Sequence, residues 1–238
     1  EENLFMARLA EQAERFEDMA EYMERVAKMG DELTLDERNL LSIAYKNSVG
    51  SRRQAVRMAR ASEEKEGPIS GPEVAELIKG YRNKMEQELH SRCADILAVL
   101  GRDLVPRASA GEPQVFYMKM KGDYYRYQAE FSSGELHTKA AQEAAEAYQA
   151  ATQVAQQTLP PEHQIRLGLA LNYSVFFNEV MGDPKQACNL AKAAFDDAQP
   201  AIATLEDGEA RDSVQIMQLL RDNIMLWTAE AEADADDR

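Results

Sequence analysis

Cations recur at helical spacing near residue 50 and form the most distinctive polar pattern in the chain. At about 100° per residue, Lys46, Gly50, Arg53, Arg57 and Arg60 fall within a band of about 80° on one helix face. Like charges one turn apart repel each other by a few tenths of a kcal/mol per pair. Lys46, Arg53, Arg57 and Arg60 form a basic stripe. Their mutual repulsion predicts a nearby anion that neutralises them.

Two kinds of anion could neutralise the basic stripe, and the sequence leaves both open. The planar fork of Arg matches two phosphate oxygens at once, and Lys adds a compact charge, so the stripe suits a phosphorylated ligand. The chain also contains 42 Asp and Glu residues, and these could pair with the cations as ordinary surface salt bridges.

A second cluster of the same chemistry lies near the middle of the chain. Lys119 and Arg126 are seven residues apart and share a helix face, and Tyr127 adds a phenol that can donate to a phosphate oxygen. Two helices that each present Arg could hold one phosphate between them. Taken alone, the aromatic residues of this segment fit a buried core better than a ligand site.

The composition is that of a globular, acidic chain. Of its 238 residues, 45% are hydrophobic and 29% charged, and the net charge is −15. An acidic surface repels nucleic acid and anionic membranes, so neither is an expected partner. Two cysteines, Cys93 and Cys188, are far apart in the sequence and indicate free, buried thiols in a reducing, cytoplasmic setting.

The sequence contains no catalytic or cofactor-binding motif. Its three His residues are scattered without the spacing of metal ligands, and it has no nucleophile elbow, phosphate-binding loop or dinucleotide fingerprint. We therefore expect no enzymatic activity, no cofactor and no metal site.

Strong helix formers dominate the chain, which predicts an all-α fold of about nine antiparallel helices. Thr34 and Glu37 fit a capping box that opens a helix running to about Glu66, and Asp183 before Pro184 opens another. Breaks at Gly and Pro separate the others: two short helices before residue 34, then helices over about 72–105, 113–130, 135–159, 162–181, 184–199 and 210–229, with Pro200 and Gly208 bracketing the last turn.

Four segments of the chain resemble the 14-3-3 family. The longest are the sequence signatures at residues 38–53 and 212–227, and residues 115–127 and 165–175 also match. The resemblance covers nearly the whole chain. It implies a cup-shaped homodimer that binds phosphoserine or phosphothreonine segments of client proteins in an extended form, in the cytoplasm and also in the nucleus.

The resemblance also implies a role for individual residues. The phosphate pocket would consist of Lys46, Arg53, Arg126 and Tyr127. The amphipathic groove would be lined by Arg57, Lys119, Leu171, Asn172, Val175, Glu179, Gln215, Ile216, Leu219, Asn223 and Trp227. Spacing supports the groove independently, because an Asn lies on each of two apolar helix faces, and an unpaired buried amide costs about 1–3 kcal/mol.

The resemblance further implies a single domain over residues 1–229, in which residues 1–33 dimerise and residues 34–229 form the groove. The dimer contact would use Leu9, Ala10, Ala13, Arg15, Asp18, Tyr81, Lys84 and Glu88. Arg15 would pair with Glu88 across the interface, and Asp18 with Tyr81 and Lys84. A heterodimer with paralogues stays open. Residues 230–238 are acidic and small, so we expect a disordered tail.

The chain departs from the usual family pattern at a few positions. Gln215 stands where the family usually has Leu on the apolar wall, which predicts weaker apolar contacts or a shifted motif preference. Ala55 and Asp183 replace serines that relatives phosphorylate, and Val56 replaces a common Trp. The loop at residues 67–72 is slightly longer than usual.

A second function remains compatible with the sequence. A helical scaffold or holdase could bind exposed apolar or acidic segments without any phosphorylation. The two hypotheses differ in one measurable property, which is whether binding depends on the phosphate.

Overall fold

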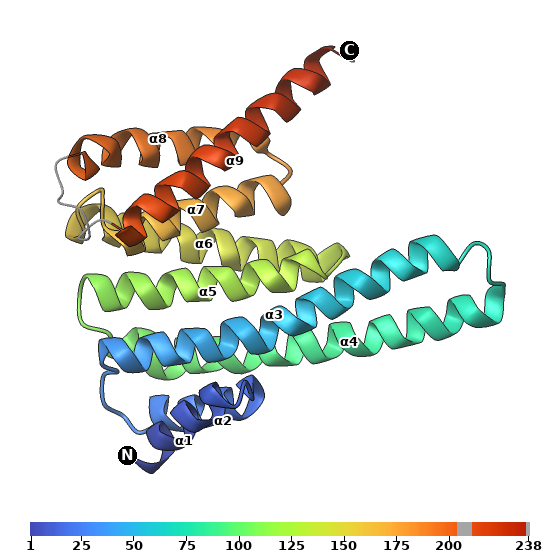
Figure 1. Cartoon of the computed structure of the whole chain (residues 1–238), viewed down its shortest axis with the longest axis horizontal. Helices are drawn as coiled ribbons and strands as arrows, with labels where there is room; N and C mark the ends of the chain where they lie inside the picture. The colour runs from blue at the N-terminus through green and yellow to red at the C-terminus, as the bar shows by residue number, and fades with distance from the viewer. Residues whose placement is uncertain (204–210, 237–238) are drawn as a thin grey trace. The chain divides into compact units, whose positions relative to one another are not determined.

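The computed structural model describes residues 1–203 and 211–236, and nearly all of them are helical (Figure 1). Within these ranges there are nine α-helices and no strand, which confirms the predicted all-α class. The helices are α1 (Glu2–Gln12), α2 (Phe16–Ala27), α3 (Leu35–Glu66), α4 (Pro72–Val99), α5 (Glu112–Glu130), α6 (Gly134–Thr158), α7 (Gln164–Glu179), α8 (Pro184–Ile202) and α9 (Arg211–Asp236).

Two of the predicted helix starts have the expected side-chain caps. At the start of α3, the Thr34 hydroxyl accepts from the backbone N–H of Glu37, and the Glu37 carboxylate accepts from the backbone N–H of Thr34. At the start of α8, the Asp183 carboxylate accepts from the backbone N–H of Gln186 at 2.9 Å. Asp183 therefore has a structural role in helix capping.

The end of α4 differs from the prediction. Regular α-helix stops at Val99, and a π-helical turn (η1, Leu100–Leu104) and a 3₁₀ turn (η2, Val105–Arg107) continue the chain. Pro106 lies inside η2 and cannot supply the N–H that a continuing α-helix requires. The helix thus loses its regular geometry several residues before the proline that ends it.

The last two helices also extend beyond their predicted ends. Pro200 lies inside α8 rather than after it. The final helix, α9, continues to Asp236, whereas composition predicts disorder from residue 230. Ala and Glu are strong helix formers, so a helix already stabilised by packing can extend through them. Residues 237–238 of the predicted tail, like residues 204–210, lie outside the described residues.

The helices divide into two compact units, residues 1–107 and residues 108–238. In the first unit, α3 and α4 form a long antiparallel hairpin, and α2 packs against α3 (Figure 1). Large side chains such as Tyr45, Leu41 and Met23 are fully buried in this unit, as is the thiol of Cys93. Single-domain organisation and a cup-shaped arrangement remain predictions.

The second unit is built on the antiparallel pair α5 and α6, to which α7, α8 and α9 are added in chain order (Figure 1). Small residues of α6 let it approach α5 closely, and Tyr148 and Phe176 fill the centre of that cluster. A second cluster lies between α7, α8 and α9 around Leu167 and Trp227. Cys188 on α8 is only partly buried, unlike the predicted buried thiol.

Candidate functional site

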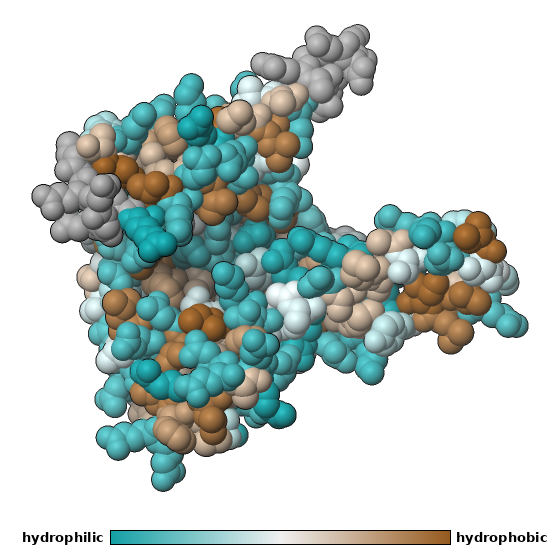
Figure 2. Space-filling model, viewed as in Figure 1, coloured by the Kyte–Doolittle hydropathy of each residue, from teal (hydrophilic) through white to brown (hydrophobic). Residues whose placement is uncertain are grey.

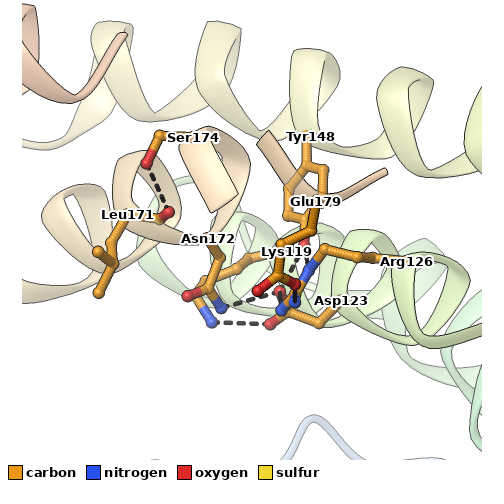
Figure 3. A network of polar contacts seen from close by, with 8 residues as sticks. All are labelled: Lys119, Asp123, Arg126, Tyr148, Leu171, Asn172, Ser174 and Glu179. Atoms are coloured by element: carbon orange, nitrogen blue, oxygen red, sulfur yellow. Dashed lines mark hydrogen bonds and ion pairs between the residues drawn. The ribbon is translucent and has the colours of Figure 1, made fainter. Parts of the chain in front are cut away.

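A buried carboxylate organises the polar side chains of the second unit. Asp123 on α5 is only 7% exposed. It accepts from Lys119 Nζ at 2.9 Å, from the Tyr148 hydroxyl at 2.6 Å and from Asn172 Nδ2 at 2.8 Å (Figure 3). Arg126 Nη2 is 3.4 Å from the same carboxylate. Three helices, α5, α6 and α7, therefore meet at one acidic group.

Arg126 is the second charged centre of this network and is 5% exposed. Its Nε donates to the Tyr148 hydroxyl at 3.0 Å, and its Nη1 is 3.9 Å from the Glu179 carboxylate. The guanidinium also lies over the ring of Tyr127, 4.7 Å from its centroid, which is cation–π geometry. The arginine is thus held on several sides by groups of its own unit.

The charges in this network shift one another's pKa values. Burial raises the pKa of the Asp123 carboxyl, but the positive charges of Lys119 and Arg126 and the hydrogen bond from Tyr148 outweigh burial, so that pKa lies below its ordinary value. Burial also lowers the pKa of Arg126, but Tyr148, Tyr127 and Asp123 together raise it well above the ordinary value. Both groups therefore remain charged at neutral pH.

The predicted groove residues of α7 and α9 form a wall that is apolar at its base and open at its rim. Leu171, Val175 and Ile216 are partly buried and pack against the cluster that contains Trp227, itself buried. Gln215 is exposed, and Leu219 is 51% exposed. Both side chains therefore have surface that a ligand could contact.

Lys119 lies beside this wall, next to Gly168 of α7. A Cβ added at Gly168 would lie 3.7 Å from Lys119 Cε and 4.0 Å from Ile216 Cδ1. Side chains of α5 and α9 thus approach the same point of α7. Asn172, one turn further along α7, donates to Asp123, so its amide is partly engaged within the protein. Asn223 on α9 is partly buried.

The predicted basic stripe lies on α3, in the other unit. Lys46 and Arg57 are exposed and Arg53 is partly exposed. Arg60 donates to Glu86 of α4 through Nη2 at 2.8 Å and through Nε at 3.0 Å. For this one cation the salt-bridge interpretation is therefore correct. A clamp that combines the stripe with Arg126 and Tyr127 would join residues of both units and remains a prediction.

The predicted dimer residues divide into exposed and internally engaged groups. Tyr81, Lys84 and Glu88 are exposed on α4, and Leu9 and Ala13 are exposed at α1. Ala10 is already buried within its own unit. Arg15 forms an ion pair with Asp18 of the same chain, so both cross-subunit pairs assigned to these two residues would have to replace or share that contact.

Sequence reasoning missed two residues that the structure places at the centre of the site, Asp123 and Tyr148. A signal for Asp123 was available, because it is four residues after Lys119 and three before Arg126, the spacings at which opposite charges pair on a helix. No comparable signal exists for Tyr148, which is on a different helix and reaches the site only through tertiary packing.

Comparison with known proteins identifies the family. The family model described as "14-3-3 protein" matches residues 6–228. The chain is 52% identical over 237 residues to "14-3-3 protein epsilon" of Drosophila melanogaster, covering 100% of this chain and 90% of the relative. It is also 52% identical over 235 residues to "Checkpoint signal transducer rad24" of Schizosaccharomyces pombe, covering 99% of this chain and 87% of the relative.

The chain belongs to the 14-3-3 family. A third relative, "14-3-3-like protein GF14-E" of Oryza sativa subsp. japonica, is 53% identical over 237 residues, which is 99% of this chain and 90% of the relative. The protein is therefore an adaptor that binds phosphopeptide segments of client proteins, and dimerisation is expected of it as a family member. Proteins of the 14-3-3 family act as adaptors and not as enzymes.

The described residues contain neither a membrane-spanning helix nor a group of metal ligands. None of the helices combines the length and the apolar character that a passage through a lipid bilayer requires. Within residues 1–203 and 211–236, no cluster of three or more His, Cys, Asp or Glu side chains has the arrangement of a metal site.

Proposed function

We propose that Lys46, Arg53, Arg126 and Tyr127 bind the phosphate of a phosphoserine or phosphothreonine in a client protein. The observation that carries this proposal is the placement of Arg126. A buried guanidinium held by Asp123, Tyr148 and Tyr127 has a fixed orientation, and a fixed fork loses little conformational entropy when it binds phosphate.

The charge balance around Arg126 gives a reason why phosphate binding would also need the basic stripe. Lys119 and Arg126 lie beside two carboxylates, Asp123 and Glu179. These four charges sum to zero. This half of the site would therefore orient a phosphate dianion but attract it only weakly. Lys46 and Arg53, with Arg57 nearby on α3, would supply the positive charge.

The remaining groove residues would hold the peptide on either side of the phosphate. Asn172 and Asn223 would hydrogen-bond to the peptide backbone, and Leu171, Val175, Ile216 and Leu219 would contact its apolar side chains. Gln215 is exposed beside this apolar face and offers an amide where Leu would offer a methyl surface. We therefore propose a motif preference that includes a polar residue next to the phosphoserine.

A stripe of exposed residues on α4 supports the proposed homodimer. Val74, Leu77, Tyr81, Lys84 and Glu88 recur at intervals of three and four residues, which places them on one helix face. Leu77 is 73% exposed and Tyr81 is 64% exposed. Figure 2 shows hydrophobic atoms gathered at the outer part of the α3–α4 hairpin. The face combines an apolar half with a charged half, as a specific interface does.

We further propose that the protein acts without catalysis and in the cytoplasm, with the nucleus as a second compartment. Client binding would then regulate the bound protein by covering or presenting a segment of it. This rests on the family, on the basic stripe and on the absence of a catalytic motif from the sequence.

The test compares a fluorescent phosphoserine peptide with its unphosphorylated counterpart by fluorescence anisotropy. We expect at least a hundredfold preference for the phosphopeptide, and its loss in Arg53→Ala and in Arg126→Ala, because each removes one fork of the site. Arg60→Ala is the matched control, since Arg60 lies on the same face of α3 but is paired with Glu86.

Each outcome of this test has a clear meaning. Equal affinity of the wild-type protein for both peptides would contradict the proposal and favour the scaffold or holdase function. An equal loss in the Arg53, Arg126 and Arg60 variants would show that total charge, rather than the assigned residues, drives binding.

A further inference from the structure

The hydroxyl of Tyr148 lies between the two charged centres of the second unit. It donates to Asp123 Oδ1 at 2.6 Å and accepts from Arg126 Nε at 3.0 Å (Figure 3). The direction of both bonds is fixed, because a carboxylate can only accept and a guanidinium can only donate. The phenol thus donates its proton to Asp123 and offers a lone pair to Arg126. These two bonds orient the guanidinium relative to the carboxylate.

The ring that carries this hydroxyl has no freedom to move. Tyr148 is fully buried, stacks on Tyr173 with centroids 5.2 Å apart, and also contacts Phe176. On its other side it lies directly against the backbone of α5 at Gly122. A Cβ added there would be 2.7 Å from two ring atoms, closer than real Cβ atoms approach such groups. The absence of a side chain at residue 122 therefore lets the ring sit where its hydroxyl reaches Arg126.

The contact through Nε decides which part of Arg126 faces a ligand. A guanidinium has five N–H groups, one on Nε and two on each terminal nitrogen. Tyr148 uses the Nε–H, Asp123 lies 3.4 Å from Nη2, and the carboxylate of the exposed Glu179 lies 3.9 Å from Nη1. Because Nε is bound to the Tyr148 hydroxyl, the end of the guanidinium formed by Nη1 and Nη2 points away from Tyr148. That end is the edge that binds two oxygens of a phosphate.

We propose that Tyr148 is a positioning residue of the phosphate site, which fixes the guanidinium of Arg126 through its Nε so that the terminal nitrogens face the phosphate. This inference rests on the proposed function, because it assumes that Arg126 binds phosphate. Tyr148 itself touches no ligand. Its hydroxyl also donates to Asp123, but it would act on the ligand through Arg126, and its position depends on Gly122 and on the stacked Tyr173.

The first experiment removes the hydroxyl and keeps the ring. Tyr148→Phe in the full chain is expected to weaken phosphoserine-peptide binding about five- to tenfold, the effect of losing one hydrogen bond to a charged group. Tyr173→Phe is the matched control, because it removes a phenol hydroxyl from the same aromatic stack and leaves the Arg126 contact intact. It should bind like wild type.

The second experiment tests whether the effect passes through Arg126. Lys has a point charge and no Nε–H, so Tyr148→Phe should cause less than a twofold further loss in an Arg126→Lys background. A double-mutant cycle of the four dissociation constants measures this coupling. A general structural effect of Tyr148→Phe would instead weaken binding equally in both backgrounds.

A spectroscopic readout keeps the inference testable without any ligand. In ¹⁵N-labelled free protein, the Nε–H of Arg126 should exchange slowly with water, and Tyr148→Phe should make that exchange fast, whereas Tyr173→Phe should not. Assignment of the resonance follows from its absence in Arg126→Lys. If Tyr148→Phe lowers the melting temperature enough to complicate the binding data, the exchange rate of the Arg126 Nε–H still tests the positioning role of Tyr148.

The results distinguish a failure of the proposed function from a failure of the positioning role of Tyr148. A wild-type protein that ignores phosphorylation would contradict the proposed function. A wild-type protein that requires phosphate while Tyr148→Phe binds equally well, keeps slow Nε–H exchange or loses affinity equally in both backgrounds would overturn only the positioning role of Tyr148.

Discussion

The basic stripe on α3 and the Asp123–Arg126 network on α5 carry similar side chains in opposite environments. Lys46 and Arg57 are exposed on a helix face, whereas Arg126 and Asp123 are buried and joined by hydrogen bonds. Any contact that an exposed cation makes is screened by water, so its contribution to folding is small. A buried, paired cation is part of the fold, and removing one partner is costly. We therefore expect the stripe cations to contribute mainly to binding, and Arg126 to contribute both to binding and to stability.

The largest expected difference concerns two arginines that we assign to one phosphate. Arg126→Ala should destabilise the protein by roughly 3 kcal/mol, because it removes a partner of a buried carboxylate. Arg53→Ala should cost about 1 kcal/mol or less, because Arg53 is partly exposed and water screens the interactions of such a cation. Both should lose phosphopeptide binding. Urea denaturation followed by circular dichroism measures the stabilities. Equal stability of the two variants would contradict the contrast drawn between exposed and buried cations.

Two glycines provide a second comparison of the same units. Gly122→Ala should cost about 2 kcal/mol, because the new Cβ would overlap the ring of Tyr148. Gly50→Ala on α3 should stabilise the protein by about 0.5–1 kcal/mol, because nothing lies within 4 Å of the added Cβ and Ala favours helix. Thermal melts of both variants give the signs. Destabilisation by Gly50→Ala would show that α3 is packed more tightly at this point than the structure indicates.

The pH dependence of stability should reflect the buried carboxylate of Asp123. The pKa of Asp123 is lower in the folded protein than its ordinary value, which is near 3.9 in an unfolded chain. Its contribution is therefore fully present above about pH 4 and is lost as pH falls through the folded-state pKa. Asp123→Asn should cost about 2 kcal/mol at pH 7, and the melting temperatures of wild type and variant should begin to converge as the pH falls below about 4. A difference in melting temperature that stays constant as the pH falls to the lowest value at which both proteins fold would mean that Asp123 does not titrate differently on folding.

Local signals in the sequence were sufficient for most helix boundaries and for the helix face that carries the basic stripe. The capping box at Thr34 and the Asp183–Pro184 start depend on residues within one helical turn, and the structure has both. The stripe of Lys46, Arg53 and Arg57 follows from helical periodicity alone. The end of α4 was harder to predict, because the π-helical turn at residues 100–104 has no short-range composition signal.

The all-α class, the family and the face of α3 that carries the cations could be predicted from the sequence, because each depends on residues within continuous chain segments. Which charges are buried together depends on tertiary packing. Tyr148 is 22 residues from Arg126 and Asn172 is 49 residues from Asp123, so their contacts exist only after α5, α6 and α7 pack. Packing also decided that Arg60 is paired with Glu86, and it assigned Asp123 a central place that periodicity alone had not revealed.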